Sequence, residues 1–427
     1  MRQLRLLWRA EDGSGQGHGL SMRLTHVTNY FSPRRLGGTE FYLRDLLREQ
    51  SKEHKASVAF RRRESSDRDL RSFEENGYFV HCLNFSKSPS KAFGEAGRAL
   101  FERVLDRDKP DIVHFHSFME LPYSLLDAAN ERGIPSVFTV HDFSILCPSV
   151  SLVKPQGVLC SGHVKGFECF QCHTGHQGLL GLEKAKRLSH LSAYLSYQRE
   201  GLEALQKFDV ILCPSEFAAR KLAEFRVPTE KLVPAPFGRT LNPRLRFKSV
   251  GGVLRFGFIG ELVEEKGIEL LLKAFQSLKG VDAELDVYGN GEQAYEEHLV
   301  SLAGKRSPIN FLGSFDRTYI DRVFERIDVL VIPTLKQETA SLLLLEAIAC
   351  NVPVIASNAG CLPELVKKHN AGLVFEFNDV ESLAEKMLEF AEEPHLTEQL
   401  SRGMAPPLTL EAHARALEEV YKSLAKR

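Results

Sequence analysis

Short apolar segments alternate with amphipathic stretches along almost the whole chain, and this alternation limits the fold more than any other feature. Several of the apolar segments are continuous runs, which is typical of parallel strands that are covered on both faces. Strands are predicted at residues 23–28, 57–60, 78–83, 111–115, 135–140, 209–213, 253–258, 284–288, 309–312, 328–332, 353–356 and 372–375. Amphipathic helices are expected between them, for example at 41–50 and 267–278. The alternation predicts an α/β fold with parallel sheets.

The strand series is interrupted once, at the break of residues 237–252. A length of 427 residues allows two to three domains. The break favours two, an N-terminal domain at 22–237 and a C-terminal domain at 253–405, with a linker at 238–252. Two doubly wound domains would face each other across a cleft and bind ligands at the carboxyl ends of their strands. The last segment, 406–427, is predicted to form a helix that can return to the first domain.

Composition excludes several classes of protein. The chain has 55 Lys and Arg against 56 Asp and Glu, a net charge of −1, so it has no global basic field for nucleic acid. No segment approaches the ~20 apolar residues of a membrane span. The apolar core of residues 1–21 is too short for a signal peptide, and we expect a disordered or mis-started leader before the strand that follows Met22. A cytoplasmic protein is the default expectation.

Two carboxylates in the second half form the strongest candidate site. Glu338 and Glu346 are separated by seven residues; Glu338 is expected in the loop after a strand, and Glu346 about two turns into the following helix. The backbone N–H groups of Thr339, Ala340 and Ser341 would lie at the N-terminus of that helix, where phosphate groups bind readily. The simpler alternative is an amphipathic helix with solvated acids.

The surrounding motifs resemble family-4 retaining glycosyltransferases, which have the GT-B fold of two Rossmann-like domains. The Glu338 segment resembles their E-x7-E signature, and the likeness continues through 351–356, 360–365 and 371–374. Upstream, residues 258–267 look like the G-R-L-x-x-x-K-G element, and 285–292 match the G-x-G turn on the nucleotide side. A G-x-G turn alone is weak evidence for this family, but the motifs occur here in the family's order and cover nearly the whole chain from Met22.

The resemblance implies roles for individual residues. Glu338 would lie near the donor sugar, Glu346 would bind the ribose hydroxyls, and Lys266 would neutralise the donor diphosphate as it leaves. No metal is implied at the diphosphate, and no carboxylate nucleophile is assigned. The sequence departs from the family at two places: Glu261 replaces the diphosphate arginine, and Ala340-Ser341 replaces Phe-Gly. A structural lysine in a loop is the alternative for Lys266.

The first half carries matching candidates. Gly37 and Gly38 precede a helix, and the family places this loop near the donor phosphates and the acceptor. His116 follows one predicted strand, and His141 and Asp142 follow the next. The resemblance implies that His141 contacts the transferred sugar, and His116 and Asp142 are further candidates for acceptor or sugar contact. The alternatives are a plain helix N-terminal turn and structural histidines.

Four cysteines after the His-Asp pair are candidate zinc ligands. Cys147, Cys160, Cys169 and Cys172 resemble a subgroup of family-4 enzymes with a cysteine-bearing loop, here residues 143–180. Cys169-x2-Cys172 suits tetrahedral zinc, and the other two could complete four thiolates. The histidines of the loop, at 163, 173 and 176, are spare candidates. The alternative is an acceptor-facing loop with free thiols; disulfides are less expected without a secretion signal.

These features predict a retaining glycosyltransferase that moves a hexose from a nucleotide-diphosphate sugar to a carbohydrate or lipid-linked acceptor, in polysaccharide or glycolipid synthesis. No cofactor is required for transfer, and zinc would be structural. Basic clusters at 34–35, 61–63 and 184–187 could meet the inner face of a membrane, although solvated surface is the simpler explanation. Two alternatives remain: a non-catalytic sugar-nucleotide-binding protein and an NAD-dependent dehydrogenase. The latter lacks a G-x-G-x-x-G after the first strand.

Overall fold

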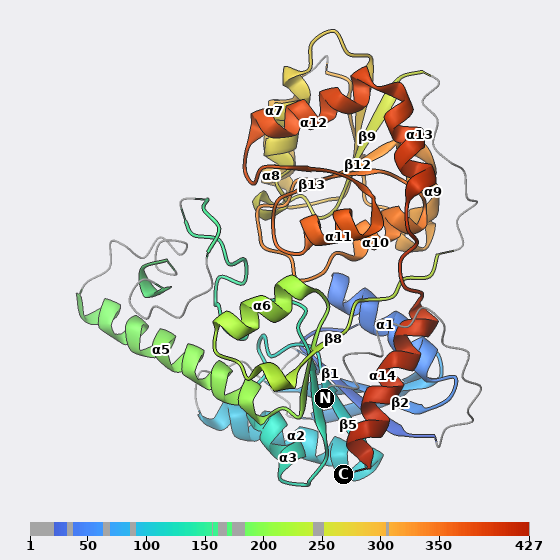
Figure 1. Ribbon diagram of the computed structural model, residues 1–427. Coiled ribbons are helices and arrows are strands. Elements are labelled where there is room, and N and C mark those ends of the chain that lie inside the picture. Colours follow the sequence, from blue (N-terminus) through green and yellow to red (C-terminus); the bar gives the residue numbers. More distant parts are fainter. Residues whose placement is uncertain are drawn as a thin grey trace. The chain divides into compact units, whose positions relative to one another are not determined.

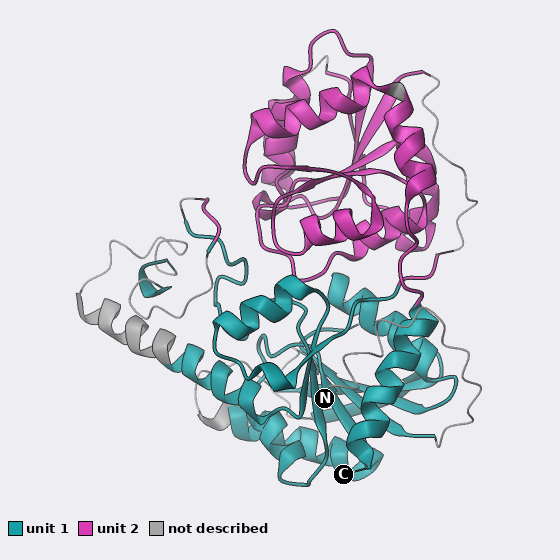
Figure 2. Ribbon diagram, in the orientation of Figure 1, with its two compact units in different colours: residues 1–155, 160–238, 410–427 teal, residues 156–159, 239–409 magenta. Residues whose placement is uncertain are grey.

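Two parallel sheets with their helices make up the chain, one in each of two units (Figure 2). The computed structural model describes residues 21–31, 37–62, 69–85, 91–155, 157–160, 169–172, 184–241, 252–304 and 307–426. Unit 1 comprises residues 1–155, 160–238 and 410–427, and unit 2 comprises 156–159 and 239–409. Unit 1 therefore contains both the beginning and the end of the chain.

The sheet of unit 1 has eight strands, and every pairing in it is parallel except the one at the β3 edge. In spatial order they are β3 (Asp69–Glu75), β4 (Tyr78–Asn84), β2 (Lys55–Arg62), β1 (Arg23–Thr28), β5 (Ile112–Phe115), β6 (Ser136–Thr139), β7 (Val210–Cys213) and β8 (Leu232–Pro234). β5, β6 and β7 are buried at every residue, as their apolar sequences predict.

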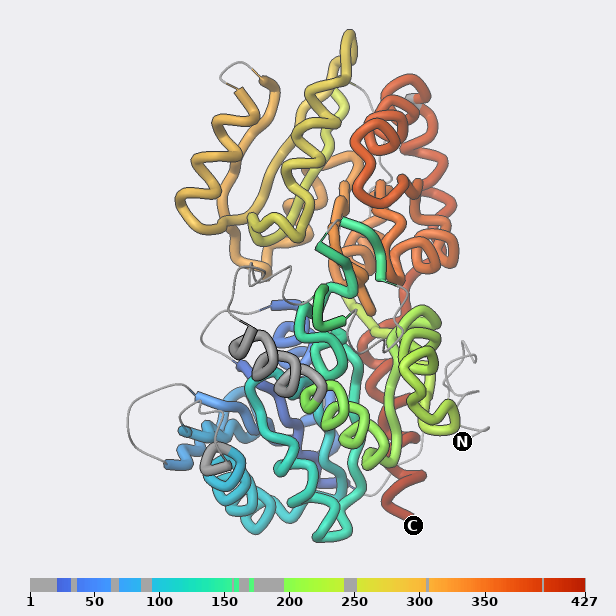
Figure 3. Tube along the Cα trace, turned by 90° about the vertical axis from the view of Figure 1, so that its left-hand side faces the viewer, coloured from blue at the N-terminus to red at the C-terminus, as the bar shows by residue number. Residues whose placement is uncertain are grey.

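Helices accompany this sheet, and one of them comes from the end of the chain (Figures 1 and 3). They are α1 (Gly38–Gln50), α2 (Lys91–Asp108), α3 (Ser124–Asn130), α5 (Lys184–Lys207), α6 (Glu216–Glu224) and α14 (Leu410–Ala425). α14 packs against α1 and buries His413, Leu417 and Tyr421. The C-terminal helix is thus part of unit 1 although it follows unit 2 in sequence.

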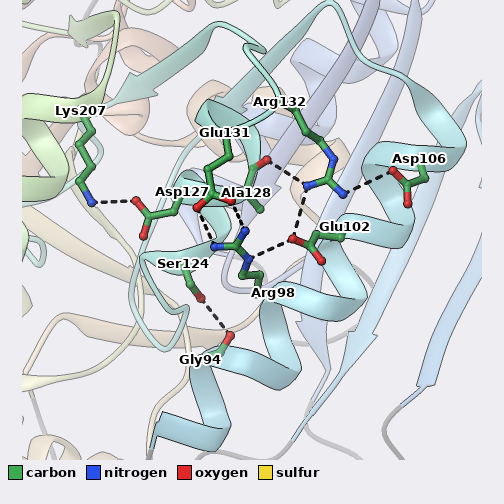
Figure 4. Close-up of polar contacts among 10 residues, drawn as sticks. All are labelled: Gly94, Arg98, Glu102, Asp106, Ser124, Asp127, Ala128, Glu131, Arg132 and Lys207. Carbon is green, nitrogen blue, oxygen red and sulfur yellow. Dashed lines mark hydrogen bonds and ion pairs between the residues drawn. The ribbon is translucent and has the colours of Figure 1, made fainter.

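Ion pairs join α2 to α3 on the outside of unit 1 (Figure 4). Arg98 on α2 pairs with Glu102 at 3.0 Å and with Glu131 just beyond α3. Arg132 reaches back to Glu102 at 3.4 Å and to Asp106 at 3.5 Å. All five side chains are at least 30% exposed, so this network contributes little to stability.

The sheet of unit 2 has six strands, all parallel. In spatial order they are β11 (Ile309–Gly313), β10 (Ala283–Tyr288), β9 (Leu254–Ile259), β12 (Val329–Ile332), β13 (Val354–Ser357) and β14 (Gly372–Phe375). Its helices are α7 (Ile268–Ser277), α8 (Gln293–Ala303), α9 (Ile320–Arg326), α10 (Leu342–Ala349), α11 (Leu362–His369), α12 (Val380–Glu392) and α13 (Pro394–Gly403). The strand order reverses beside β9, and ligands bind at such switch points.

The predicted α/β fold with two parallel sheets is confirmed. Each predicted strand is present within one or two residues of its expected ends, whereas β3 and β8 were not predicted. β3 has the polar sequence of an exposed edge strand, and β8 has three residues. Residues 1–20 and most of the predicted linker lie outside the described residues. Within the described part of the chain, no helix combines the length and apolar character that crossing a bilayer would need.

Candidate functional site

The loops that follow β9 and β12 are held together in unit 2, because these two strands are neighbours at the switch point. Leu335 N donates to Glu265 O at 2.8 Å. Gly267 has φ +72°, and a Cβ there would lie 1.9 Å from Pro333 O, so no other residue fits between the loops. This contact fixes Lys266 beside the segment that carries Glu338.

Lys266 and Glu338, both predicted as donor-site residues, form an ion pair of 3.2 Å. The same carboxylate oxygen, Oε1, accepts from Thr334 Oγ1 at 3.3 Å and lies 3.9 Å from Lys336 Nζ. Burial raises the pKa of the Glu338 carboxyl, but the two lysines and the hydrogen bonds outweigh it and leave the pKa below its usual value. Glu338 is therefore ionised at neutral pH.

The backbone of Glu338 is held in place by the segment that leads into α11. Cys361 N donates to Glu338 O at 2.9 Å. Gly360 has φ +65°, and a Cβ at that position would lie 2.2 Å from the same carbonyl oxygen. The segment 360–365, noted in the sequence, thus has a structural role, because it fixes the loop that carries Glu338.

Helix α10 begins later than the sequence analysis expected. Ser341 is its N-cap and accepts from Leu344 N at 3.2 Å, so residues 338–341 are not helical. The prediction that Glu346 lies about two turns into the helix is therefore wrong; it lies about one turn in. Thr339, Ala340 and Ser341 precede the first helical residue, Leu342, at the end where a helix favours anions.

Glu346 is fully buried and faces two arginines that sequence reasoning missed. Its Oε2 accepts from Arg317 Nη2 at 2.6 Å, and its Oε1 lies 2.9 Å from Arg239 Nη2. Both arginine side chains are less than a quarter exposed. Arg239 was placed in the predicted linker and Arg317 in an unmarked loop. Only an indirect argument could have predicted these arginines from the sequence: a glutamate on the buried face of a helix requires a cation as its partner.

In unit 1, the two predicted histidines come together because β5 and β6 are adjacent strands. His116 Nδ1 lies 3.0 Å from His141 Nε2. His116 is buried, and His141 is partly buried. Burial lowers the pKa of His141 to about 3 and that of His116 well below its ordinary value, so both rings are uncharged at neutral pH.

The glycine pair starts α1, with Gly37 as the N-cap and Gly38 as the first helical residue. Gly37 N donates to the buried Glu40 at 2.8 Å, which closes a capping interaction that was not predicted. Burial, followed by the nearby charge of Asp142, raises the pKa of Glu40. The carboxylates of Glu40 and Asp142 are therefore near enough to influence each other electrostatically.

The four candidate zinc ligands belong to unit 1, are partly exposed, and form no disulfide within the described part of the chain. Burial raises the pKa of the Cys147 thiol to about 11 against backbone hydrogen bonds from Ser149 and Leu152, with smaller increases from Cys160 and Cys172. Burial, Cys160 and Cys169 raise the pKa of Cys172. The thiols thus influence one another, although residues 161–168 and 173–183, with the three spare histidines, lie outside the described residues.

One part of the basic-cluster prediction is wrong. Arg61 is 3% exposed; it pairs with Glu120 at 3.0 Å and donates to Phe85 O at 3.1 Å. It therefore stabilises the interior and is not available to a membrane. Residues 34–35 and Arg63 lie outside the described residues.

Two family models match the chain, one over each half. Residues 36–239 match Glycosyltransferase Family 4, and residues 246–404 match Glycosyl transferases group 1. Together with the two doubly wound sheets, these matches support a group 1 glycosyltransferase with the GT-B fold. The cysteine-bearing subgroup is not distinguished by them.

Two relatives illustrate the similarity in sequence. An uncharacterized glycosyltransferase of Methanocaldococcus jannaschii is 27% identical over 51% of this chain and 60% of its own length. A GDP-mannose-dependent monoacylated alpha-(1-6)-phosphatidylinositol monomannoside mannosyltransferase of Corynebacterium glutamicum is 34% identical over 31% of this chain and 36% of its own. The similarity to these two relatives thus extends over less than two thirds of each.

Solved structures agree in fold over nearly the whole chain. Sucrose-phosphate synthase of Thermosynechococcus elongatus is 16% identical, with a TM-score of 0.62 over 94% of this chain and 96% of the other. HepE of Anabaena, in complex with UDP and glucose, is 15% identical, with a TM-score of 0.65 over 94% and 100%. At these identities the likeness shows the fold.

Proposed function

We propose that the protein transfers a hexose from a nucleoside-diphosphate sugar to a hydroxyl of a carbohydrate or lipid-linked acceptor, with retention of the anomeric configuration. The observation that carries the proposal is the Lys266–Glu338 ion pair at the carboxyl ends of two adjacent strands, with Glu346 buried one helical turn beyond. These are the residue types and positions of the donor site in the family that the motifs resemble.

In the proposed reaction, the bond between the anomeric carbon and the diphosphate oxygen breaks, and its electron pair leaves with the diphosphate. The acceptor oxygen bonds to the anomeric carbon on the same face, and its proton passes to the departing phosphate oxygen. Lys266 stabilises the charge that develops on the diphosphate. Glu338 binds the donor sugar, Glu346 binds the ribose hydroxyls, and the amides of Thr339, Ala340 and Ser341 bind phosphate oxygens.

Positive charge near the nucleotide supports this assignment despite Glu261. Glu261 stands where the family has an arginine, and it is exposed. Arg239 and Arg317 both contact Glu346, and each has a side chain that is less than a quarter exposed. We propose that these two arginines replace the missing cation, which keeps the nucleotide-binding region favourable for an anion.

The residues of unit 1 are assigned to the acceptor and the transferred sugar. His141 contacts the sugar, His116 and Asp142 support that contact, and the Gly37-Gly38 turn approaches the acceptor. The supporting observations are the 3.0 Å contact between the two histidines and the proximity of Asp142 to Glu40 beside the turn. Relatives and structural neighbours name GDP-mannose and UDP with glucose, which supports a hexose donor.

The test begins with thermal stabilisation by a panel of UDP-, GDP- and ADP-sugars. A donor at 100 times its dissociation constant adds about 2.7 kcal/mol to the stability of the folded state. Transfer and donor hydrolysis are then compared for wild type, Lys266→Ala, Glu338→Ala and the control Lys273→Ala, an exposed lysine on α7. Wild type no more active than the first two variants would overturn the proposal. The anomeric configuration of the product tests retention.

A non-catalytic sugar-nucleotide-binding protein is the second candidate, and Glu261 and Ser341 favour it because both depart from the family pattern. It predicts stabilisation by a nucleotide sugar without transfer to any acceptor. A dehydrogenase would instead be stabilised by NAD, and the absence of that shift excludes it.

We also propose a structural zinc held by Cys147, Cys160, Cys169 and Cys172. Cys160 N donates to Leu152 O at 2.8 Å, which brings Cys160 to the loop that hydrogen-bonds the Cys147 sulfur. Cys169 and Cys172 lie one turn apart on a helical segment. Among the described residues, three histidines form the one group whose possible ligand atoms lie within 4.8 Å of one another. The four cysteine sulfurs are farther apart than this, so we propose that they move together when zinc binds.

Elemental analysis of protein purified without chelator or added metal tests this site. One zinc per chain is expected in wild type and in the control Cys213→Ala, a buried cysteine of β7. Loss of zinc is expected in Cys172→Ser. A wild-type ratio well below one per chain would contradict the proposal.

Binding to anionic vesicles, compared with neutral ones, tests peripheral membrane contact in the same preparation.

A further inference from the structure

His141 lies against two buried aromatic rings inside unit 1. Tyr42 of α1 is edge-on to the His141 ring, with 5.1 Å between the ring centroids, and the centroid of Phe237 is 5.3 Å away. Tyr42 and Phe237 are stacked on each other at 4.3 Å, and neither is more than 5% exposed. Rings at these separations are in contact, so Tyr42 and Phe237 restrict how the His141 ring can move.

Phe237 belongs to a segment that the backbone does little to hold. The last backbone contact before it is made by Ala235 N, which donates to Cys213 O at 2.7 Å. Pro236 has no N–H, and within the described part of the chain no backbone–backbone hydrogen bond involves residues 236–238. Contacts with side chains must therefore decide where the Phe237 ring lies.

The imidazole of His413, on α14, bonds to both sides of this pair of rings. Its Nδ1 lies 2.9 Å from Pro236 O, and its Nε2 lies 2.7 Å from Tyr42 Oη. A carbonyl oxygen can only accept, so Nδ1 carries a proton and donates it. Burial lowers the pKa of His413 to about 4, so the ring is neutral at pH 7 and Nε2 accepts from the phenol. One ring thus holds Tyr42 and the residue before Phe237 together.

A hydrogen-bonded network of neutral groups also contacts His141. His116 Nδ1 lies 3.0 Å from His141 Nε2, and His116 Nε2 lies 2.9 Å from His26 Nδ1. The Gln50 amide completes this histidine chain, with Oε1 at 2.8 Å from His26 Nε2. The rings are uncharged because burial lowers the pKa of all three histidines.

Helix α14 takes part in this neutral network as well. Tyr421 Oη lies 2.7 Å from His114 Nδ1 and accepts from Gln50 Nε2 at 3.5 Å. Tyr421 and His413 are both on α14, and neither is more than 1% exposed. His413 has the more direct connection to His141, because both rings that touch His141 also touch His413.

We propose that His413 is a positioning residue for His141 and acts through Tyr42 and Phe237. By donating to Pro236 O and accepting from Tyr42 Oη, it holds the two rings against His141. The orientation of His141 is then fixed before a ligand arrives. A small misplacement of a group that contacts the reacting part of a substrate lowers the rate strongly. The sugar contact of His141 rests on the proposed function, whereas its positioning by His413 does not.

A purely structural role, in which His413 only attaches α14 to unit 1, is the competing explanation. The matched control is His81 on β4, which is fully buried in the same sheet and bonds to Ser72 Oγ at 2.8 Å and Asp108 Oδ2 at 2.9 Å. In the sheet, β2, β1 and β5 separate β4 from β6, the strand that precedes His141. His81→Ala should therefore cost stability and leave His141 unchanged.

NMR of the histidine ring protons reports the position of His141 directly. The protein is labelled with ¹³C at its 15 histidines, and His141→Asn assigns the signals of interest. The ring currents of Tyr42 and Phe237 shift the His141 protons by an amount that depends on distance and angle. We expect these shifts to change in His413→Ala and to stay as in wild type in His81→Ala. Unchanged shifts in His413→Ala would overturn the proposal, as would equal changes in the two variants.

Two further variants separate hydrogen bonding from the packing of the rings. His413→Gln supplies one donor and one acceptor in place of the ring nitrogens, and it should return the His141 shifts toward those of wild type. Tyr42→Phe keeps the ring beside His141 and removes only the hydroxyl, so it should change the shifts less than His413→Ala. If His413→Ala does not fold, Tyr42→Phe decides the question, and shifts identical to those of wild type would refute the role of His413.

Kinetics with the donor found by the nucleotide-sugar panel adds a functional readout. We expect about tenfold lower kcat for His413→Ala and an unchanged affinity for the nucleoside diphosphate, which unit 2 is proposed to bind. Adding Phe237→Leu should lower kcat little further, since both substitutions act on one contact. A kcat equal to that of wild type, or additive losses, would contradict the proposal. If no nucleotide sugar binds, the proposed function fails, while the His141 shifts still decide the positioning.

Discussion

The two units place opposite kinds of chemistry at the same position of similar sheets. At the strand ends of unit 1, histidines are buried and uncharged and hydrogen-bond to one another. At the strand ends of unit 2, Glu338 and Glu346 are paired with lysines and arginines. A diphosphate requires charge, whereas hydroxyl groups require donors and acceptors, so the difference matches the parts of a nucleotide sugar that each unit is proposed to bind.

The difference also has an energetic basis. A histidine can lose its proton and still hydrogen-bond, so it tolerates burial without a counterion. A guanidinium keeps its charge in any protein environment, so Arg239 and Arg317 need a carboxylate such as Glu346. Unit 1 should therefore respond to pH, and unit 2 to the removal of a partner charge.

Among single substitutions, removing the central charge of unit 2 should have the largest effect on stability. Glu346→Gln leaves two partly buried arginines without their carboxylate, and we expect unit 2 to lose about 3 kcal/mol. Urea unfolding followed by hydrogen exchange in peptides of each unit measures this loss. Glu398→Gln, at an exposed pair with Arg402, should cost less than about 0.5 kcal/mol. Equal effects of the two substitutions would remove the energetic contrast between buried and exposed charge.

Acid should destabilise unit 1 before unit 2. The folded pKa values of His26 and His413 are about 4 and that of His141 about 3, below the ordinary 6.5, so the unfolded state binds more protons between these values. The contribution of these neutral histidines to the free energy of unfolding is fully present above about pH 7 and decreases as the pH falls toward 4. Each of the three should cost about 2 kcal/mol between pH 7 and pH 5. Hydrogen exchange at both pH values tests this, and earlier opening of unit 2 would contradict it.

Interrupting the neutral network should have an intermediate effect. Tyr421→Phe removes the hydroxyl that partners His114, and leaving that buried nitrogen without its partner should cost about 1–2 kcal/mol. The matched control is Tyr319→Phe, at a half-exposed tyrosine of unit 2, where no measurable change is expected. Denaturation midpoints measure both. A cost no greater than that of the control would mean that the phenol is not part of the network.

The smallest effect should come from the exposed ion pairs between α2 and α3 (Figure 4). Arg132→Ala removes contacts of 3.4 and 3.5 Å to Glu102 and Asp106, all of them solvated. We expect less than about 1 kcal/mol, decreasing at high salt. Thermal melts in low and high salt test this. A loss as large as that of Glu346→Gln would show that burial does not decide the strength of charge pairs here.

The fold was largely readable in the sequence because continuous apolar strands alternate with helices throughout. What sequence reasoning missed depends on contacts between distant segments. The polar edge strand β3 depends on its pairing with β4, and Glu40 on the turn at Gly37. Arg239 and Arg317 lie 107 and 29 residues from Glu346, and only the folded sheet brings them to it.

The candidate site shows the same division. Glu338 and Lys266 could be found because local motifs mark them, and adjacent strands bring them into contact. The histidine chain could not be found, since His26 and Gln50 occur in ordinary strand and helix sequences. Their roles arise from tertiary hydrogen bonds that span up to 90 residues.

The position of α14 has a consequence for how the protein is made. His413 and Tyr421 are synthesised after all of unit 2, yet they bond Tyr42 and Gln50, which are synthesised before it. During synthesis, the hydrogen bonds of Tyr42 and Gln50 to α14 cannot form until all of unit 2 has been synthesised. A chain that stops before residue 410 would keep the strands of unit 1 and lose these hydrogen bonds, so the stability of unit 1 depends on a helix that is synthesised after unit 2.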